Sequence, residues 1–387
     1  MTQDKQHNRP NVPPLRFPEF TEPWEQHLTT DFFEFKNGLN PDVKRFGTGI
    51  KFISVMDILN NRYITYDKII SAVEAKDSDL RDFGVNYGDI LFQRSSETLE
   101  DVGRANVYLD EKPALFGGFV IRGKRIGDYN PLFFRYLLSS PSVRKRIIVK
   151  GAGAQHFNIG QDGLSKVSLF VPSAKEQDRI AQLLNAIDKR IEVQSGLIED
   201  LQKLKAALYQ KVFSSIPGEE VALSNLAKII KGKQINGTEL FDSGNYYVMN
   251  GGTLPSGFYN EYNTPANTIS ISEGGNSCGY VQFNNVPFWS GGHCYTLQIT
   301  SKQIHLSYLY HYLKHREQVI MALRIGSGLP NIQKKDLERF PILMPTIEIQ
   351  QKLSRIFDSL QRKEEVEKSI LNRCLSQKQY LLQKMFI

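Results

Sequence analysis

One stretch of this sequence has the spacing of a phosphate-binding loop. The segment GFVIRGKR, Gly118–Arg125, places Gly-Lys after a glycine and a gap of four residues. Arg125 stands where such a loop needs a serine or threonine to ligate Mg²⁺, and the residues between the glycines are typical of a β-strand. The pattern therefore predicts a strand and no nucleotide site.

A second stretch, NPLF at Asn130–Phe133, differs by one residue from the N-P-P-F/Y motif of adenine methyltransferases. The glycine-rich strand-turn-helix of a methyl-donor site does not accompany it. Asparagine is a preferred helix N-cap, and proline is favoured at the first helical position. We interpret Asn130 as a cap and Pro131 as the first residue of a helix.

Histidine and cysteine pairs were the remaining candidates for chemistry. His311 and His315 are four residues apart on a predicted helix and could share a metal, but Tyr312 replaces the glutamate of a metalloprotease. We expect this pair to be solvated or to face DNA. His293 and Cys294 are adjacent in a predicted strand, where neighbouring side chains point to opposite faces. The sequence therefore predicts no catalytic or metal site.

The chain contains an internal repeat, and each copy starts at a glycine-rich turn, GAGAQHFNIG or GSGLPNIQ. Aligning Asn158 with Asn331 keeps an offset of 173 residues, without a gap, as far as Phe213 and Phe386. The matched pairs inside this frame include Ile159 and Ile332, Leu164 and Leu337, Pro172 and Pro345, Gln177 and Gln350, Glu192 and Glu365, and Val193 and Val366.

Each copy predicts a short strand closed by proline, VSLFVP or FPILMP, and then a long helix. The first helix, over 174–213, would be roughly 60 Å long at 1.5 Å per residue. Ser173 can cap it, with Glu176 completing a capping box. In the second copy Thr346 can cap, but Ile349 stands in the place of the glutamate.

Both predicted helices carry a narrow apolar stripe at 3–4 spacing, and Cys374 falls on the second stripe, where we expect it to be buried. A lone surface helix of this length would leave its stripe exposed, so each helix is expected to pair with its copy as a coiled coil. The segments before the helices are short β-type runs followed by one helix, which indicates an α+β class. The expected domains are 1–173 and 214–345, and the expected long helices are 174–213 and 346–387.

The composition favours a polyanionic partner and an intracellular setting. The chain has 48 Lys and Arg against 41 Asp and Glu, a net charge of +7 and a pI near 9.0. Its three cysteines have no CxxC spacing, which argues against disulfides and structural zinc and fits a reducing cytoplasm. No apolar run approaches the roughly 18 residues of a membrane span, and the start lacks the apolar middle of a secretory signal.

Two divergent domains are each followed by a matching long helix, and four segments are distinctive: Pro13–Gln26 (PPLRFPEFTEPWEQ), Gly88–Phe92 (GDILF), Lys175–Asp188 (KEQDRIAQLLNAID) and Ile347–Leu360 (IEIQQKLSRIFDSL). Together these features resemble the specificity subunit of type I restriction–modification enzymes. The resemblance covers nearly the whole chain. In the second copy Ile349 replaces Glu176 and Gln361 replaces Asp188, so equal partner contacts at the two helix starts are not implied.

This resemblance implies a non-catalytic, cytoplasmic DNA-binding subunit of a DNA modification and restriction system. Each globular domain would be a target recognition domain for one half of a bipartite, asymmetric site. The helices would pair antiparallel with pseudo-twofold symmetry, set the spacer and dock two methyltransferase subunits. Those subunits would bind S-adenosylmethionine, separate restriction/motor subunits would use ATP and Mg²⁺, and no cofactor would belong to this chain.

The side chains that we expect to contact DNA are basic, amide and hydroxyl groups on loops broken by glycine. A single lysine or arginine on such a loop is often only solvated, and Arg144–Arg146 could simply cover a helix face. The candidates in the first domain are Lys44, Arg45, Arg94, Ser95, Arg104, Lys150, Gln155 and His156. The candidates in the second domain are Lys231, Lys233, Gln234, Asn250, Asn276, Ser277, Tyr280 and Arg324.

Two other function classes would share some of these sequence features. A structural adaptor could use the long helices to bind a protein and no DNA, but the basic loops and the net charge argue against it. An enzyme, such as a nuclease or a methyltransferase with scrambled motifs, would need an acidic metal cluster or a methyl-donor site, and the sequence predicts neither.

Overall fold

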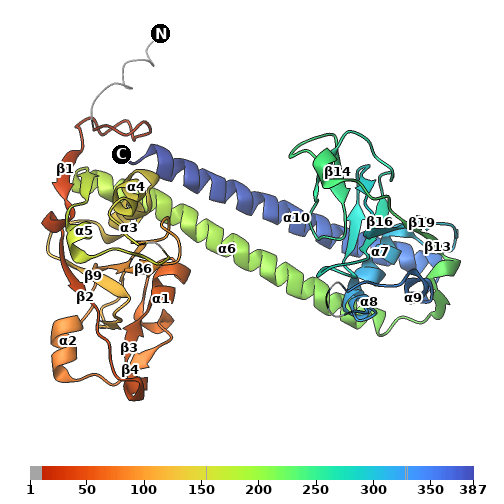
Figure 1. The fold of residues 1–387 in the computed structure, drawn as a ribbon, viewed down its shortest axis with the longest axis horizontal. Helices are drawn as coiled ribbons and strands as arrows, with labels where there is room; N and C mark the ends of the chain where they lie inside the picture. The colour runs from red at the N-terminus through yellow and green to blue at the C-terminus, as the bar shows by residue number, and fades with distance from the viewer. Residues whose placement is uncertain (1–10, 154, 327, 329) are drawn as a thin grey trace, which may run out of the picture. The chain divides into compact units, whose positions relative to one another are not determined.

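The computed structural model describes residues 11–153, 155–326, 328 and 330–387. The chain divides into two compact units (Figure 1). Unit 1 comprises the residues up to Ser195 together with Ile370–Ile387, and unit 2 comprises Gly196–Ser369. Each unit therefore holds one globular domain and a part of each long helix. The domain boundaries expected at residues 173, 213 and 345 stay a prediction.

Unit 1 is built on a four-stranded antiparallel sheet in the order β2-β9-β5-β7. Beside it lie a small β4-β3-β8 sheet and the strand pairs β1-β11 and β6-β10. The strands are β1 (Glu25–Leu28), β2 (Phe33–Asn37), β3 (Phe46–Ile53), β4 (Ala72–Val73), β5 (Ile90–Gln93), β6 (Ser95–Ser96), β7 (Ala105–Val107), β8 (Leu115–Phe116), β9 (Val120–Arg125), β10 (Phe157–Asn158) and β11 (Ser168–Val171).

Apolar residues cover both faces of this sheet, so its central strands β5 and β9 are mostly buried, whereas the edge strand β2 is partly exposed. One face packs against α3 with Phe133 and Phe134, and the other packs against Ile53 and Ile58 of the small β3 lobe and α1. The short helices are α1 (Val55–Asn60), α2 (Asp77–Phe83), α3 (Pro131–Ser139), α4 (Pro141–Ile148) and α5 (Gln161–Ser165).

Unit 2 repeats this plan with a four-stranded antiparallel sheet in the order β13-β19-β16-β17. A β15-β14-β18 sheet and the β12-β20 pair lie beside it. The strands are β12 (Glu219–Ala222), β13 (Ala227–Lys231), β14 (Tyr246–Met249), β15 (Gly257–Tyr259), β16 (Thr268–Ser272), β17 (Val281–Asn284), β18 (Trp289–Ser290), β19 (Cys294–Ile299) and β20 (Pro341–Met344). The short helices are α7 (Leu306–His315), α8 (Glu317–Met321) and α9 (Lys334–Glu338).

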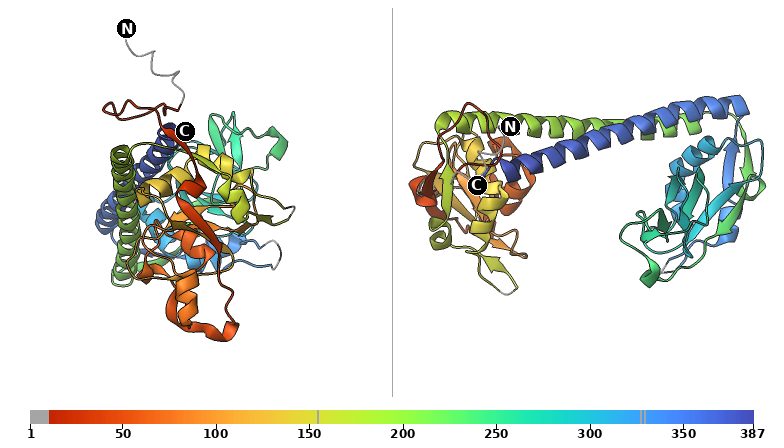
Figure 2. Two further views of the ribbon diagram at one scale, coloured as in Figure 1. Left: turned by 90° about the vertical axis from the view of Figure 1, so that its left-hand side faces the viewer. Right: turned by 90° about the horizontal axis from the view of Figure 1, so that it is seen from above.

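The long helices are α6 (Ala174–Phe213) and α10 (Ile347–Lys384), and they pair inside each unit (Figure 2). In unit 1 the first half of α6 meets the end of α10, where Lys378 Nζ lies 2.6 Å from Asp188 Oδ1. In unit 2 the end of α6 meets the start of α10, where the rings of Tyr209 and Phe357 are 4.6 Å apart. The pairing is therefore antiparallel, Cys374 is buried as expected, and the α+β class with two domains and two long helices is confirmed.

A matched glutamine ties each long helix to its globular domain. The side-chain amide of Gln177 donates to the carbonyl of Pro172 at 3.0 Å and accepts from the backbone N–H of Asn130 at 3.0 Å. Gln350 makes the same pair of bonds in unit 2, to a proline carbonyl at 2.9 Å and from a short-helix N-terminus at 2.8 Å. Both glutamines are buried, which explains why the repeat retains them.

Two expectations about helix starts have different outcomes. The side chain of Asn130 caps α3 by accepting from Phe133 N at 3.0 Å, and Pro131 is the first helical residue, as predicted. The capping box expected at Glu176 is wrong. Its buried carboxylate instead accepts two hydrogen bonds of 2.7 Å from Arg16 and one of 3.3 Å from Trp24, because the N-terminal segment folds over the start of α6.

Candidate DNA interface

Three chain segments meet at one end of the four-stranded sheet in each unit. They are the residues that follow strand β5 or β16, a Gly-Gly turn that precedes β9 or β19, and an Asn-Ile turn. We call this region the turn edge; in unit 1 it comprises Arg94–Ser95, Gly117–Phe119 and Asn158–Ile159, and in unit 2 it comprises Glu273–Gly274, Gly291–His293 and Asn331–Ile332.

The Gly-Gly turns have the same backbone contacts in both units. The N–H of Arg94 donates to the carbonyl of Phe119 at 2.9 Å, and the N–H of Glu273 donates to the carbonyl of His293 at 2.9 Å. These hydrogen bonds give Arg94 and Glu273 equivalent places, although their charges are opposite.

The second glycine of each turn lies against a side-chain amide. A Cβ added at Gly118 would lie 2.0 Å from Asn40 Oδ1, and one added at Gly292 would lie 2.4 Å from Gln234 Oε1. Both distances are far below a van der Waals contact, so a larger residue would displace the amide from the turn. The glycines thus let a polar side chain of the preceding loop reach the turn edge in each unit.

The Asn-Ile turns close the turn edge from its other side. The N–H of Ile159 donates to the carbonyl of Arg94 at 3.0 Å, and the N–H of Ile332 donates to the carbonyl of Glu273 at 2.9 Å. Both isoleucine side chains are buried, so they anchor the turns in the core. The two glycine-rich turns of the sequence repeat therefore have one structural role, which is to return the chain from the turn edge to the core.

Five of the predicted contacts of unit 1 lie at its turn edge or in the loop leading to it. The side chain of Arg94 is partly exposed, and its Nη1 donates to the carbonyl of Gly118 at 3.3 Å. Ser95 donates its hydroxyl to the Asn158 side chain. The other three, Lys150, Gln155 and His156, are exposed on the loop that precedes Asn158.

The other three predicted residues of unit 1 lie away from the turn edge. Arg45 pairs with Asp79 and donates to the carbonyl of Glu74, so it supports the β3 lobe; Lys44 beside it is exposed. Arg104 pairs with Asp101 at 2.6 Å. Their DNA contacts stay predictions, and the structure gives Arg45 and Arg104 intramolecular partners.

In unit 2 four predicted residues surround the Gly-Gly turn. Lys231 ends β13, and Lys233 and Gln234 follow it on an exposed loop. The side-chain oxygen of Asn250 accepts from the backbone N–H of His293 at 3.1 Å. Cationic and amide side chains thus gather beside one turn, as base and phosphate recognition requires.

The remaining predicted residues of unit 2 lie on the turns flanking this group. Asn276 and Ser277 are in the glycine-rich turn after β16, and Asn276 is exposed. Arg324 is exposed in the loop that leads to Asn331. Tyr280 is partly buried, and the Lys314 ammonium of α7 lies 4.1 Å from its ring centre, so this side chain packs against α7.

Sequence reasoning missed the residues at the centre of the turn edge. Phe119 is 69% exposed, and His293 is exposed at the equivalent place in unit 2. The signal was present in the sequence, because GGF and GGH each immediately precede the apolar strand β9 or β19. Cys294, next to His293, is buried, and the two side chains point to opposite faces of the strand as predicted.

The expectation that His311 is solvated or faces DNA is wrong. His311 is fully buried; its Nδ1 is 2.7 Å from the Tyr209 hydroxyl, and its Nε2 is 2.9 Å from Asp358 Oδ1. Burial lowers the pKa of His311, and the Asp358 carboxylate partly opposes this effect. His315 stacks on Phe213 with ring centres 5.1 Å apart, so both histidines join α7 to the long helices.

The basic run Arg144–Arg146 is mostly structural. The guanidinium of Arg144 donates to the carbonyls of Gly103 at 2.7 Å and Val102 at 2.7 Å, and burial lowers its pKa to about 10. Arg146 donates to the carbonyl of Ser168 at 3.3 Å. Arg144 thus fixes the loop before β7 and Arg146 contacts the start of β11, so both arginines are poor candidates for DNA contacts.

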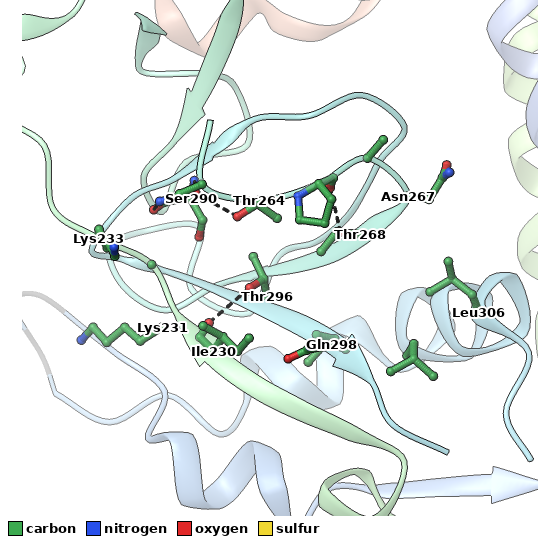
Figure 3. A pocket seen from close by; sticks show the side chains of 16 residues that line it. Ile230, Lys231, Lys233, Thr264, Asn267, Thr268, Ser290, Thr296, Gln298 and Leu306 are labelled. Atoms are coloured by element: carbon green, nitrogen blue, oxygen red, sulfur yellow. Dashed lines mark hydrogen bonds between the residues drawn. The ribbon is translucent and has the colours of Figure 1, made fainter. Parts of the chain in front are cut away.

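Unit 2 has a pocket of about 500 Å³ on the face of its sheet opposite the main core. Figure 3 shows Lys231 and Lys233 at one end of the pocket and Leu306 at the other, with Thr296 and Gln298 of β19 between them. In unit 1 the β3 lobe and α1 cover the corresponding face. The pocket therefore marks a place where the two domains differ beside otherwise matching turn edges.

Across the described part of the chain, no three His, Cys, Asp or Glu side chains gather as metal ligands would. None of the helices in that same part is both long enough and apolar enough to cross a membrane.

A family model described as the type I restriction modification DNA specificity domain matches residues 21–203 and 217–374. A type I specificity subunit from Mycoplasma pneumoniae is 36% identical over 141 residues, which span only 35% of this chain and 37% of that protein. A type I restriction enzyme specificity subunit from Methanocaldococcus jannaschii is 23% identical over 410 residues, covering 93% of this chain and 94% of that protein.

Solved structures share the fold over nearly the full length. The S subunit of a type I restriction-modification system from M. genitalium aligns with a TM-score of 0.70 at 21% identity, covering 97% of this chain and 99% of that chain. A chain from a structure concerned with assembly and conformational transition of the type I R-M system aligns with a TM-score of 0.55 at 15% identity, covering 93% and 96%. With the two matched domains, these findings place the chain in the family of type I restriction modification DNA specificity subunits, which are non-catalytic.

Proposed function

We propose that each unit reads one half of an asymmetric, bipartite DNA target through its turn edge. The observation that carries this proposal is the repeated backbone of the turn edge, which presents different side chains in the two units. A conserved backbone with divergent side chains is what two related readers of different sequences require. Arg94 and Glu273 occupy equivalent places but have opposite charges. The two units therefore offer different side chains to DNA, and the two half-sites should differ in sequence.

The side chains around the turn edge support DNA as the ligand. Exposed lysines such as Lys233 can contact phosphates, whereas amides such as Gln234 suit the edges of bases. Phosphate contacts release counterions, so the affinity for DNA should fall steeply as salt rises.

The long helices support partner docking. Val193 in unit 1 is 72% exposed, and Val366, its match in the repeat, is 58% exposed in unit 2. Leu204 and Tyr380 are further exposed apolar residues on these helices. Apolar side chains facing water at matching positions suit two copies of one helical partner. We assign these faces to two methyltransferase subunits, and we assign to the helix pair the role of setting the spacer between half-sites.

The remaining subunits and cofactors follow from this assignment. S-adenosylmethionine would be bound by the methyltransferase subunits, and ATP with Mg²⁺ by restriction/motor subunits that join the same cytoplasmic complex. This chain would hold no cofactor of its own, and its contribution would be the choice of DNA sequence.

Methylome sequencing of the host with and without this gene tests the proposal. We expect one asymmetric motif with two specified halves and an unspecified spacer to lose its methylation when the gene is removed. Loss of no motif, or loss of a continuous motif without a spacer, would refute the reading of two half-sites.

A further inference from the structure

The equivalent places of Arg94 and Glu273 carry opposite charges, and this difference has a chemical consequence for DNA reading. Among the residues that the structure describes, no carboxylate pairs with Arg94, and its one side-chain hydrogen bond is the 3.3 Å contact to Gly118. A guanidinium has five N–H donors, so most of those on Arg94 remain available. Arginine commonly binds guanine through O6 and N7.

Glu273 is in a different environment. It is only 8% exposed, and its Oε1 accepts from Lys231 Nζ at 2.6 Å and from the Tyr295 hydroxyl at 3.1 Å. Its buried Oε2 has no hydrogen-bond partner within the described residues, and His293 Nδ1 lies 3.6 Å from it. A carboxylate buried in this way cannot reach a base, but it holds the Lys231 ammonium at the turn edge.

Lys231 itself is accessible, because its side chain is 53% exposed. It pairs with Tyr295 across the sheet, as Asn37 pairs with Ile121 in unit 1, so Lys231 and Asn37 are equivalent strand ends. The cation next to the ends of the sheet strands therefore follows β5 in unit 1, as Arg94, and ends β13 in unit 2, as Lys231. In the sheet order these places are two strands apart, about 10 Å at the usual strand spacing.

The geometry points to a specificity-determining pair in unit 2: Lys231 contacts the acceptor edge of a guanine in the second half-site, and Glu273 is the positioning residue that aims it. In unit 1 Arg94, which follows a different strand, makes the corresponding guanine contact without a positioning carboxylate. The inference rests on the proposed function, because it assigns a base to one of the two readers. It also predicts that the recognised guanine lies at a different place relative to the turn edge in each of the two half-sites.

The experiment uses the full chain in complex with its methyltransferase subunits. Lys231→Met, Glu273→Gln and the double variant are bound to a duplex DNA library in which each position of the second half-site is randomised, at constant salt. We expect each single variant to lose about 5- to 150-fold of the preference for guanine at one shared position. The double variant should lose no more than Lys231→Met alone, because the two residues act on one contact.

Three controls separate positioning from general damage. The first half-site, read by the same chain, must keep its base preferences. Lys228→Met, an exposed lysine on the same strand, should leave the second half-site unchanged. Lys231→Arg should retain the guanine preference, because it keeps the cation and its donors.

Other outcomes would overturn the inference. A uniform loss of affinity for all sequences, with a salt slope reduced by about 1, would make Lys231 a phosphate contact. Additive losses in the double variant, or losses at two different positions, would show that Glu273 does not act through Lys231. Unchanged preferences in a selectively binding complex would refute the inference alone, whereas a wild-type complex without sequence preference would refute the proposed function as well.

Discussion

Replacing Glu364 by glutamine should destabilise the helix pair within unit 2 in a pH-dependent manner. The carboxylate of Glu364 is 8% exposed and accepts from Lys205 at 2.6 Å, Lys368 at 2.7 Å and Gln202 at 2.9 Å. Burial alone would raise its pKa, but these hydrogen bonds and charges hold the pKa at about 2. The ionised form is therefore strongly favoured in the folded chain.

The magnitude follows from the difference between the folded pKa and the ordinary value of 4.5. A depression of this size corresponds to about 3 kcal/mol at neutral pH, and the half-exposed Lys368 lowers the expected value to about 2–3 kcal/mol. Because the folded pKa is lowered, this stability is complete above pH 4.5 and is lost as the pH falls towards 2. Glutamine keeps the shape but has no charge, so it lacks this contribution at every pH.

Urea unfolding followed by circular dichroism measures the effect, with wild type and Glu364→Gln compared between pH 7 and pH 2. The free energy of unfolding should differ by about 2–3 kcal/mol at pH 7, and the difference should shrink below pH 4.5. Glu365→Gln is the matched control, because Glu365 is adjacent on α10 and exposed. No difference at pH 7, or a difference that persists unchanged to pH 2, would refute the reasoning.

Three further predictions concern DNA. Arg94→Ala should cost about 1–3 kcal/mol at one position of the first half-site, whereas the exposed Arg81→Ala should cost nothing; equal losses at every position in a library binding assay would contradict a base contact. The affinity of the complex should fall steeply with salt in fluorescence anisotropy titrations, and a flat response would count against phosphate contacts. Inserting four residues near Gly196, with a matching insertion near Ile370 in α10, should lengthen the helix pair by about 6 Å and the spacer by about two base pairs. Methylome sequencing would show this change, and an unchanged spacer would contradict the spacing role.

The organisation into two domains and two long helices was predictable from the sequence because the sequence contains an internal repeat. The constant offset from Asn158 to Phe213 identified the strand, the proline, Gln177 and the long helix together, and each has the same structural role in both copies. Periodicity alone also placed Cys374 in the core. Such residues recur in both copies because each copy forms the same strand and the same buried stripe of a long helix.

Features that depend on contacts between distant segments were not predictable. His311 was expected at the surface, but Tyr209 and Asp358, from two other helices, bury and bind it. Glu176 matched a local capping box, yet Arg16, 160 residues away in sequence, takes its carboxylate. Likewise, no local pattern reveals that Glu273 faces Lys231 across the sheet. Composition indicated which residue types could bind DNA, and only the fold showed which of them share the turn edge.

Each unit is proposed to read its half-site independently of the other. Exchanging residues 1–173 for those of a relative with a different target, and sequencing the methylome of the resulting strain, tests this claim most directly. We expect one half of the methylated motif to change while the other half stays the same. A change in both halves, or in neither, would contradict it.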